Sequence, residues 1–588
     1  MKPAPPFTID APETDRLVPH MADGGLPPWP GVANVQIHRS CLRRPDLDGG
    51  LGCGFQHHMD LAIWKGRLYA AWHASEVNED RAPWRLLLST SEDGFNWSDP
   101  YDAFPHQAIA SLRMYFYQAA NGRFLMMATM RRGMNFVIEA WKESLVVREI
   151  HAGHSLGPIH TLRLRHEAPP GMPPWFHDSD DAGFTAACRE LLANRPYLEQ
   201  HDYGILLDPP DRMPWHDRAA WKNDQPPEGF WTFGKGASVF RRDDDSLVYV
   251  SKLGYATQSL DGGLTWEEPC IPPGLVTHTA KVWGQRATGG GFFLAYNPTS
   301  GPRYPLAGVH SAEGRCFRQL RSIHGELPPR RFQGYAKDFG AQYVRGVGLW
   351  SNDGSRPHDA ASWIIYSVNK EDIWVSRIPP GPPQEAPHGS TAFADLPPGP
   401  LASGWNFYTG RWFSARLAPE APGGPTVLEL RDRDPYDYAR ATRTFPEAGD
   451  LRVQITLRQS RAGAAPLEIE LSPAFGGLAP IRLSGSPAGW HAGHGCHLRF
   501  AGPLQPGVWH TLALTARRST GSFTVRVDGG PWVELPLPAD SQPFQRLSLR
   551  TGLPRWGPAN VLDASTDLPE PESCYQIRSV DIIPLTPP

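Results

Sequence analysis

Short stretches in which apolar and polar residues alternate fill most of the chain between residues 32 and 378. Examples are 59–75, 85–97, 121–132, 246–266 and 291–297. A two-residue period indicates a strand with one buried face, and paired stretches separated by turn residues predict β-hairpins. Only one section, within 186–198 (AACRELLANRPYL), has the pattern of a short helix. The chain is therefore predicted to be all-β.

Two of the predicted turns nearly match each other. Residues 259–266 (SLDGGLTW) fit the pattern Ser/Thr-x-Asp-x-Gly-x-x-Trp throughout, whereas 90–97 (TSEDGFNW) carry Glu92 at the Asp position and Asp93 beside it. This pattern resembles the Asp box, a turn between antiparallel strands of sialidase-like β-propellers. Such an Asp accepts backbone N–H groups of its own turn, so Asp93 and Asp261 are predicted to be structural.

The spacing of these turns predicts the architecture. Ser259 and Ser311, which begins a shorter version of the motif, are 52 residues apart, a period typical of one four-stranded propeller blade. Residues 32–378 would then form six or seven blades. An insertion around 167–230 interrupts the period, and a long loop of this kind is expected to wall the central pocket.

Proline-rich composition indicates the boundaries of the domains. Residues 1–31 are predicted to be an N-terminal arm, and 379–400 a stiff linker. Within 401–588, the section 507–535 alternates cleanly and contains a Val-Asp-Gly-Gly turn. It resembles the laminin-G/concanavalin-like jelly rolls, so the second domain is predicted to be a β-sandwich. Such domains bind glycans or pack on a catalytic neighbour, and the absence of a site motif favours packing.

Charge and composition exclude several classes of protein. A net charge of −4 and a pI of about 6.6 argue against a strongly basic nucleic-acid binder. The chain contains no run of about 18 apolar residues, so no membrane span is predicted. Seven scattered Cys and an N-terminus without an apolar signal region predict free thiols in the cytoplasm, although a chain that had lost its signal peptide would be secreted. The oligomeric state cannot be read from the sequence.

The function of a propeller is expected at the mouth of its central channel, where the innermost strands converge. The first candidates are His57 and His58, followed along the chain by His73. Histidine is the natural general acid/base near neutral pH. The alternative is structural, a His pair that caps a turn or fills the core. These histidines lack a carboxylate or thiol companion for zinc, so no metal or other cofactor is predicted. Ca²⁺ in the pocket or at a blade edge stays open, although no ligand pattern indicates it.

Further candidates are polar, basic or aromatic residues expected on inner strands. Lys281, Trp283 and Gln285 share one strand face, and an arginine such as Arg331 or Arg345 can hold a carboxylate through two hydrogen bonds. The charged run 369–372 could equally be a solvated turn or an internal salt bridge. The full set is Arg113, Tyr115, Arg132, Lys281, Trp283, Gln285, Arg303, Arg331, Lys337, Tyr343, Arg345, Asn369 and Lys370.

The run from KVWGQR (281–286) through QYVRG (342–346) to YSVNKEDIWV (366–375) is similar to a group of bacterial sialidase-fold proteins. These resemble propeller glycoside hydrolases and polysaccharide lyases that act on rhamnose–glucuronate linkages. The resemblance implies an acidic oligosaccharide or polysaccharide substrate. It also implies that His57 or His58, alone or with His73, is the acid/base, while Arg331 or Arg345 neutralises the carboxylate. Cleavage by elimination and cleavage by hydrolysis both stay open.

Three alternatives remain. An exo-sialidase would need an arginine triad, for which Arg39, Arg331 and Arg345 are available, and Tyr343 would be its nucleophile. Another hydrolase on the same fold is the second alternative. The third is a non-enzymatic propeller that binds a glycan without cleaving it.

Overall fold

A computed structural model gives the structure of the chain. It describes residues 4–19, 21–42, 44–47, 49–79, 84–105, 113–130, 144–164, 172–201, 236–252, 254–277, 280–334, 337–356, 361–475, 479–553, 555 and 557–585. The chain folds into two compact units, and each consists of several chain segments. The first comprises Met1–Thr14, Ile37–Leu320 and Phe332–Pro382, and the second comprises Asp15–Gln36, Arg321–Arg331 and Pro383–Pro588.

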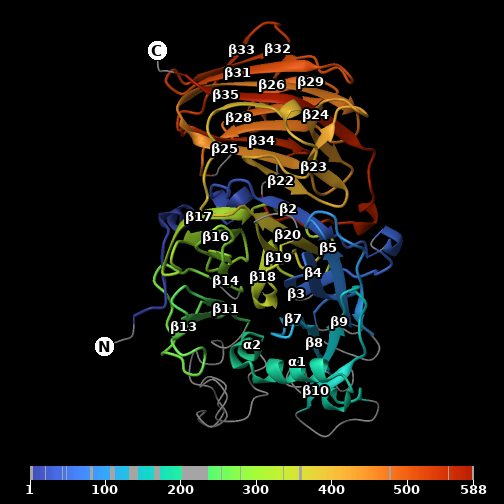
Figure 1. Cartoon of the computed structure of the whole chain (residues 1–588). Coiled ribbons are helices and arrows are strands. Elements are labelled where there is room, and N and C mark those ends of the chain that lie inside the picture. The colour runs from blue at the N-terminus through green and yellow to red at the C-terminus, as the bar shows by residue number, and fades with distance from the viewer. Residues whose placement is uncertain are drawn as a thin grey trace. The chain divides into compact units, whose positions relative to one another are not determined.

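The first unit is a β-propeller built from mostly antiparallel sheets (Figure 1). One blade contains β3 (Phe55–Trp64), β4 (Arg67–Ser75), β5 (Trp84–Ser91) and β6 (Tyr101–Phe104). The next contains β7 (Met114–Gln118), β8 (Phe124–Met130), β9 (Ser144–Ile150) and β10 (His160–Leu164). A third contains β11 (Ser238–Arg241), β12 (Leu247–Val250) and β13 (Ala256–Ser259). A fourth contains β14 (Trp283–Arg286), β15 (Phe292–Tyr296), β16 (Leu306–Ser311) and β17 (Cys316–His324), with β1 (Thr8–Asp10) parallel to β17. The last contains β18 (Ala341–Asn352), β19 (Ser362–Val368) and β20 (Asp372–Ile378).

The first strand of each blade faces a common centre. Strand β18 contacts β3, β7, β11 and β14, and β3 also contacts β7. The described residues form five blades, whereas the spacing of the motifs predicted six or seven. The count was too high because the 168 residues between Ser91 and Ser259 span two blade steps rather than three. The helical insertion takes up the remaining length.

The helix predicted within 186–198 is confirmed, as two short helices. Helix α1 (Ala182–Ala193) begins where the Asp181 side chain accepts a hydrogen bond from Phe184 N, and α2 (Arg195–Gln200) begins where Asn194 accepts from Tyr197 N. Both are the usual N-cap interaction of a short polar side chain. Helix α1 packs on the apolar face of β8 and β9 through Phe184 and Leu191. The part of the insertion from 202 to 235 lies outside the described residues.

Both Asp boxes are structural turns, as predicted. Asp93 Oδ1 accepts from Phe95 N and Asn96 N at 2.8 Å each, so Asp93, not Glu92, takes the Asp role in the first box. Asp261 Oδ1 accepts from Thr265 N at 2.8 Å in the second. Gly94 has a φ of 79°, and a Cβ built on it would lie 2.1 Å from the Trp363 ring, so only glycine fits there.

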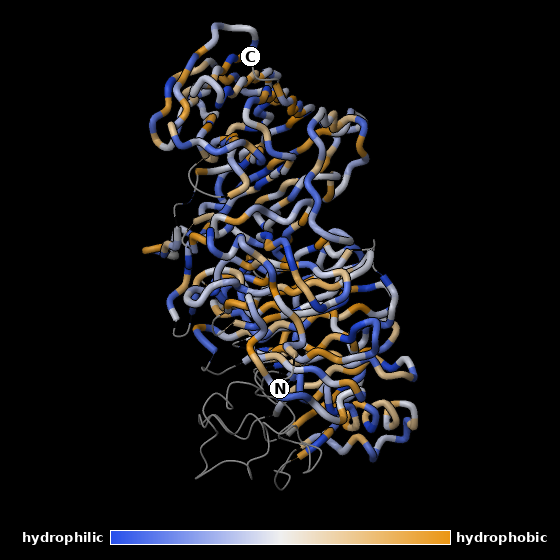
Figure 2. The backbone as a smooth tube through the Cα atoms, turned by 90° about the vertical axis from the view of Figure 1, so that its left-hand side faces the viewer, coloured by the Kyte–Doolittle hydropathy of each residue, from blue (hydrophilic) through white to orange (hydrophobic). Residues whose placement is uncertain are grey.

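The second unit is a β-sandwich. One sheet contains β22 (Trp405–Thr409), β25 (Arg440–Ala448), β34 (Phe544–Thr551), β27 (Leu467–Ser472), β28 (Ile481–Ser486), β29 (Gly489–His494) and β30 (His497–Gly502). The other contains β23 (Phe413–Pro419), β24 (Thr426–Asp432), β35 (Ser573–Pro584), β26 (Asp450–Arg461), β31 (His510–Arg517), β32 (Ser522–Val527) and β33 (Val533–Pro536). Figure 2 shows hydrophobic and hydrophilic residues alternating along the chain in both units.

Two segments that were expected outside the sandwich are part of its sheets. Residues Ala33–Val35 of β2 (Ala33–His38) pair in parallel with β22. Strand β21 (Gly389–Ala392), within the proline-rich section expected to be a linker, pairs with β35. Proline-rich composition did not reveal this, because strand pairing needs only a few residues with free N–H groups between the prolines. Short 3-10 helices occur at Pro12–Arg16, Ala22–Gly25, Pro45–Leu47, Phe176–Asp178, Phe393–Asp395 and Ala564–Thr566.

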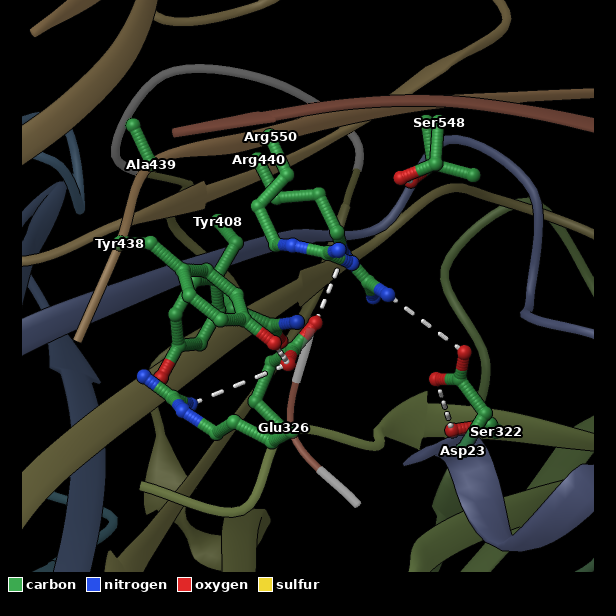
Figure 3. Close-up of polar contacts among 12 residues, drawn as sticks. Asp23, Ser322, Glu326, Tyr408, Tyr438, Ala439, Arg440, Ser548 and Arg550 are labelled. Atoms are coloured by element: carbon green, nitrogen blue, oxygen red, sulfur yellow. Dashed lines mark hydrogen bonds and ion pairs between the residues drawn. The ribbon is translucent and has the colours of Figure 1, made fainter. Parts of the chain in front are cut away.

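A network of paired arginines lies in the second unit (Figure 3). Asp23 Oδ2 accepts from Arg546 Nη1 at 2.8 Å, and Arg440 Nε lies 2.7 Å from Glu326 Oε1. Arg550 and Glu470 form two hydrogen bonds, at 2.9 and 3.0 Å. The remaining pairs are Arg482 with Glu468 and Arg555 with Asp437. Each of these arginines therefore has a carboxylate partner. We call this group the paired-arginine network.

None of the seven cysteines, all of which lie in the described part of the chain, forms a disulfide, as predicted, and four of them are buried. Among the described residues, no helix has the length and apolar composition that a membrane crossing requires.

Candidate functional site

Two β-bulges place unusual residues at the centre of the propeller. In β3, the pairing with β4 shifts between His57 and Asp60, and His58 has a φ of 55°. In β18, the pairing with β19 shifts between Gln342 and Arg345, and Tyr343 has a φ of 59°. A positive φ is costly for residues other than glycine, and bulges redirect side chains near functional sites. Both bulges therefore mark this centre as the candidate site.

The predicted catalytic residues come together at these bulges. The His57 ring centre lies 4.2 Å from the Tyr343 ring centre and 4.7 Å from that of His58. The His73 ring centre lies 6.2 Å from that of His58. Ser367 Oγ lies 2.8 Å from His57 Nδ1, and Glu79 Oε1 lies 2.8 Å from His58 Nε2.

Both imidazoles are held in the neutral form. Burial lowers the pKa of His57 well below its usual value, and the positive charges of Lys370 and Arg303 lower it further. Burial lowers the pKa of His58 to about 3, although the Glu79 carboxylate opposes this shift. At neutral pH both imidazoles are unprotonated, so they are available as bases that burial has weakened, and they carry no proton to give away as imidazolium.

Cations surround the Tyr343 side chain. Lys252 Nζ donates to Tyr343 Oη at 2.6 Å and lies 4.9 Å from the ring centre. Lys281, Arg303 and Lys370 lie 5.0, 4.9 and 5.9 Å from the same ring centre. We call these four residues the cation cluster. Asp338, whose carboxylate lies 2.8 Å from Arg303 and 3.4 Å from Lys370, contacts this cluster. Such a concentration of positive charge attracts an anionic ligand.

Arg345 lies on the same strand, two residues beyond Tyr343. Its guanidinium is fully buried, lies 4.8 Å from the Tyr115 ring centre and 5.5 Å from that of Trp283, and has its Nη1 atom 3.3 Å from His201 Nδ1. In the described part of the chain, its Nε and Nη2 atoms are buried without a hydrogen-bond partner. These two atoms form the edge of the guanidinium that binds a carboxylate through two parallel hydrogen bonds.

Asp60 is the acidic group of this region with a raised pKa. Burial raises the pKa of its carboxyl to about 6, although the Arg345 charge and the hydrogen bond from Phe116 N, at 3.0 Å, favour the ionised form. A carboxyl with such a pKa holds a proton for part of the time near neutral pH. It can therefore act as a proton donor where the histidines cannot.

Three predicted substrate-binding residues have structural partners instead. Arg331 lies in the second unit and forms a buried ion pair with Asp567, with Nη1 3.1 Å from Oδ2. Lys337 Nζ lies 3.0 Å from Glu371 Oε1. Asn369 Oδ1 accepts from Gly340 N at 2.9 Å and closes a turn. For Arg331 and Lys337 the cause is that residue type alone does not reveal whether a buried charge is already neutralised. For Asn369 it is that the sequence does not show which amides cap turns.

The remaining predictions have mixed outcomes. Trp283 Nε1 donates to Gln285 Oε1 at 2.8 Å, so these side chains do share a face. Arg113 is buried, and its charge contributes to the lowered pKa of His58. Arg132 lies outside the described residues. Of the arginines named for a sialidase triad, Arg331 pairs with Asp567, and Arg39 Nη1 contacts Cys41 Sγ at 3.4 Å.

The prediction also missed several residues of the site. Lys252 follows a strand at a position that gave no signal, and Glu79 lies in a charged stretch that resembled a surface loop. The insertion was expected to wall the pocket, but nothing singled out His201 within it. Asp60 was the detectable omission, since it lies two residues after His58 on the same strand and is the one carboxylate of that strand.

One group has the geometry for a metal ion. Single ligand atoms of His57, His58 and Glu79 all lie within 4.8 Å of one another. Two imidazoles do not suit Ca²⁺, which prefers oxygen ligands. The charges of Lys281 and Lys370, which already lower the pKa values of these histidines, would also oppose a divalent cation. The absence of a metal therefore stays a prediction.

Both parts of the chain are similar to known proteins. Residues 8–112 and 106–202 match a family model described as "Beta-prop_BT_1020-like, N-terminal beta propeller", and 405–567 match one described as "Sialidase-like, CBM domain". A solved structure described as "Sialidase" is 27% identical, with a TM-score of 0.85 over 98% of this chain and 54% of that one. The chain is a β-propeller followed by a β-sandwich, and these parts are similar to a sialidase-type propeller and to a sialidase-like carbohydrate-binding module. It spans about half the length of that sialidase.

Other solved structures are far less similar. The sialidase of Trypanosoma rangeli in complex with sialic acid is 11% identical, with a TM-score of 0.33 over 95% of this chain and 97% of that one. A xylan β-1,4-xylosidase from Bacillus halodurans is 12% identical, with the same TM-score over 96% and 100%. These scores are too low to bear on function. No curated protein sequence matches the chain.

Proposed function

We propose that this chain is a sialidase-like glycoside hydrolase that removes an acidic sugar, whose carboxylate Arg345 binds. The free Nε and Nη2 edge of Arg345 carries the proposal. Burying a charged group without a partner is expensive, so an acceptor from the ligand is the simplest reason to retain it. The similarity to a solved sialidase at 27% identity supports a hydrolase.

Tyr343 is the nucleophile in this proposal. Its oxygen accepts from Lys252, and a positive donor there stabilises negative charge on the phenol oxygen. His57 takes the phenol proton, because its Nδ1 contacts Ser367 while its Nε2 is buried without a partner in the described part of the chain. Asp60 gives a proton to the leaving oxygen. Tyr343 then forms a bond to the anomeric carbon, and water releases the sugar.

Elimination from a rhamnose–glucuronate linkage is the second candidate. The neutral form of His57 favours it, because a neutral imidazole can remove the proton next to the bound carboxylate group. Arg345 would hold the uronate in the same way and make that proton more acidic. The two reactions differ in product, since elimination creates a carbon–carbon double bond that absorbs near-UV light and hydrolysis does not.

The test is turnover of a panel of sialylated and glucuronylated oligosaccharides, with released sugar and near-UV absorbance both recorded. Tyr343→Phe should lose turnover and keep binding. Tyr69→Phe is the matched control, since that hydroxyl contacts His154 at 2.6 Å, away from the cation cluster. Full activity of Tyr343→Phe would exclude it as the nucleophile. Binding by the wild type without any product would identify a glycan-binding propeller instead.

A further inference from the structure

His201 connects the helical insertion to the candidate site. It follows α2, and its backbone N–H donates to the last carbonyl groups of that helix. Its ring is buried, stacks on Tyr115 with 3.9 Å between ring centres, and meets Tyr197 edge-on at 4.5 Å. The Arg345 guanidinium lies over the same Tyr115 ring. The imidazole and the guanidinium therefore share one aromatic support.

The contact between His201 and Arg345 requires a particular form of the imidazole. A guanidinium only donates hydrogen bonds, so Nδ1, 3.3 Å from Arg345 Nη1, must present its lone pair. Gln200 Nε2 lies 3.2 Å from the other ring nitrogen, but a hydrogen bond from a charged donor is the stronger one. Burial and the charges of Arg345, Lys281 and Arg113 lower the pKa of His201 well below its usual value, which keeps the ring neutral.

We propose that His201 is a positioning residue for carboxylate recognition. It accepts from Nη1 and so fixes the rotation of the guanidinium, which leaves Nε and Nη2 as the edge that meets the carboxylate. Without this acceptor the guanidinium could turn about its last bonds and present a different edge. This inference rests on the proposed function, because it assumes that Arg345 binds a carboxylate. It gives the insertion a role in specificity for acidic sugars.

Two variants of His201 separate positioning from packing. His201→Phe keeps an aromatic ring on Tyr115 but removes the acceptor. His201→Asn keeps an acceptor near the position of Nδ1 but loses the stacked ring. If His201 positions Arg345, His201→Phe should weaken carboxylate binding about tenfold, which corresponds to one hydrogen bond to a charged group. His201→Asn should stay within about threefold of the wild type, although it packs less well.

The measurement is calorimetric titration with glucuronic acid and N-acetylneuraminic acid, with glucose as the neutral control. Each variant is also checked for folding by thermal unfolding. In an Arg345→Ala background, His201→Phe should cause no further loss of affinity, because its effect passes through that guanidinium. With a turned-over substrate, KM should rise while kcat changes little.

The outcomes distinguish the two proposals. If the wild type binds neither acid, or if Arg345→Ala binds as well as the wild type, the proposed function fails and this inference fails with it. If Arg345→Ala loses affinity but His201→Phe does not, only the positioning role is wrong. An equal loss in His201→Asn and His201→Phe, or an undiminished loss in the Arg345→Ala background, would show that the residue acts by packing alone.

Discussion

Arginine side chains are buried in both units, but their surroundings differ. In the second unit, every member of the paired-arginine network faces a carboxylate, as Arg550 faces Glu470. In the propeller, Arg345 is equally buried, and its contacts are with an imidazole and two aromatic rings, while the Asp60 carboxyl interacts with it through charge. A buried ion pair within the chain holds segments together, whereas a buried guanidinium whose donors lack acceptors needs them from outside. A carboxylate of the chain in contact with the guanidinium therefore distinguishes a structural arginine from a ligand-binding one.

Breaking an ion pair in the second unit should have the largest effect. Glu470→Leu leaves Arg550 buried without its carboxylate, and the expected loss is about 3–5 kcal/mol of unfolding free energy. Denaturant unfolding measures it. The double variant Glu470→Leu with Arg550→Met is the matched control and should recover most of the stability, because no charge is left unpaired. A single variant as stable as the wild type would contradict the structural role.

Removing Arg345 should have the opposite effect, a loss of ligand affinity without a loss of stability. Arg345→Met should weaken binding of an acidic sugar by about 3 kcal/mol, roughly 100-fold, while the unfolding free energy stays the same or rises. The reason is that, in the described part of the chain, no group accepts from its Nε and Nη2 atoms, and Asp60, whose ionised form the Arg345 charge favours, can take up a proton when that charge is removed. Titration calorimetry and denaturant unfolding of the same variant check both halves. A large loss of stability with unchanged affinity would make Arg345 a structural residue like Arg550.

Acid should destabilise the propeller before the second unit. Three fully buried histidines of the propeller, His57, His58 and His201, have lowered pKa values. In the second unit, the fully buried histidine with a lowered pKa is His324. Lowered histidine pKa values give stability that is complete well above pH 6.5 and is lost as pH falls towards the folded values. Between pH 7 and pH 6 each contributes a loss of about 0.7 kcal/mol, so the two additional histidines should cost the propeller about 1.4 kcal/mol more than the second unit.

Carboxyl groups do not reverse this order. The pKa is raised to about 6 for Asp60 in the propeller and for Asp437 in the second unit, so their effects balance. Burial raises the pKa of Asp432 further, and that shift makes the second unit more stable as pH falls. Hydrogen exchange at pH 7 and pH 6, followed on peptides from each unit, measures the difference. Faster loss of protection in the second unit would show that these histidines are not neutral in the folded state.

The smallest loss of unfolding free energy is expected from removing a carboxylate whose partners are backbone groups. Asp93→Ala removes the hydrogen bonds to Phe95 N and Asn96 N in the first Asp box. The expected cost is about 1 kcal/mol, because the turn can be partly hydrated after the change. Turnover of acidic sugars should stay at the wild-type level. Lost turnover in a folded Asp93→Ala protein would mean that the box contributes to the site, contrary to its geometry.

The local pattern of the sequence predicted much of this structure. Strand alternation identified the all-β class, the Asp boxes identified their turns, and the helical section lies in the predicted insertion. His57, His58, His73 and Tyr343 were selected as polar residues of inner strands, and they do converge. Such features depend on neighbours within a few residues, which a single sequence displays directly.

Tertiary structure decided what each charged residue does. Arg331 and Arg345 are the same residue type in similar strand-rich sequence, but among the described residues only Arg331 forms a hydrogen-bonded ion pair, with Asp567, which is 236 positions away. Likewise, His201 reaches Arg345 across 144 positions. The assignment of residues 15–36 and 321–331 to the second unit also depends on distant pairing. Whether a buried charge is neutralised depends on which remote groups the fold brings within about 4 Å, and the local sequence does not contain that information.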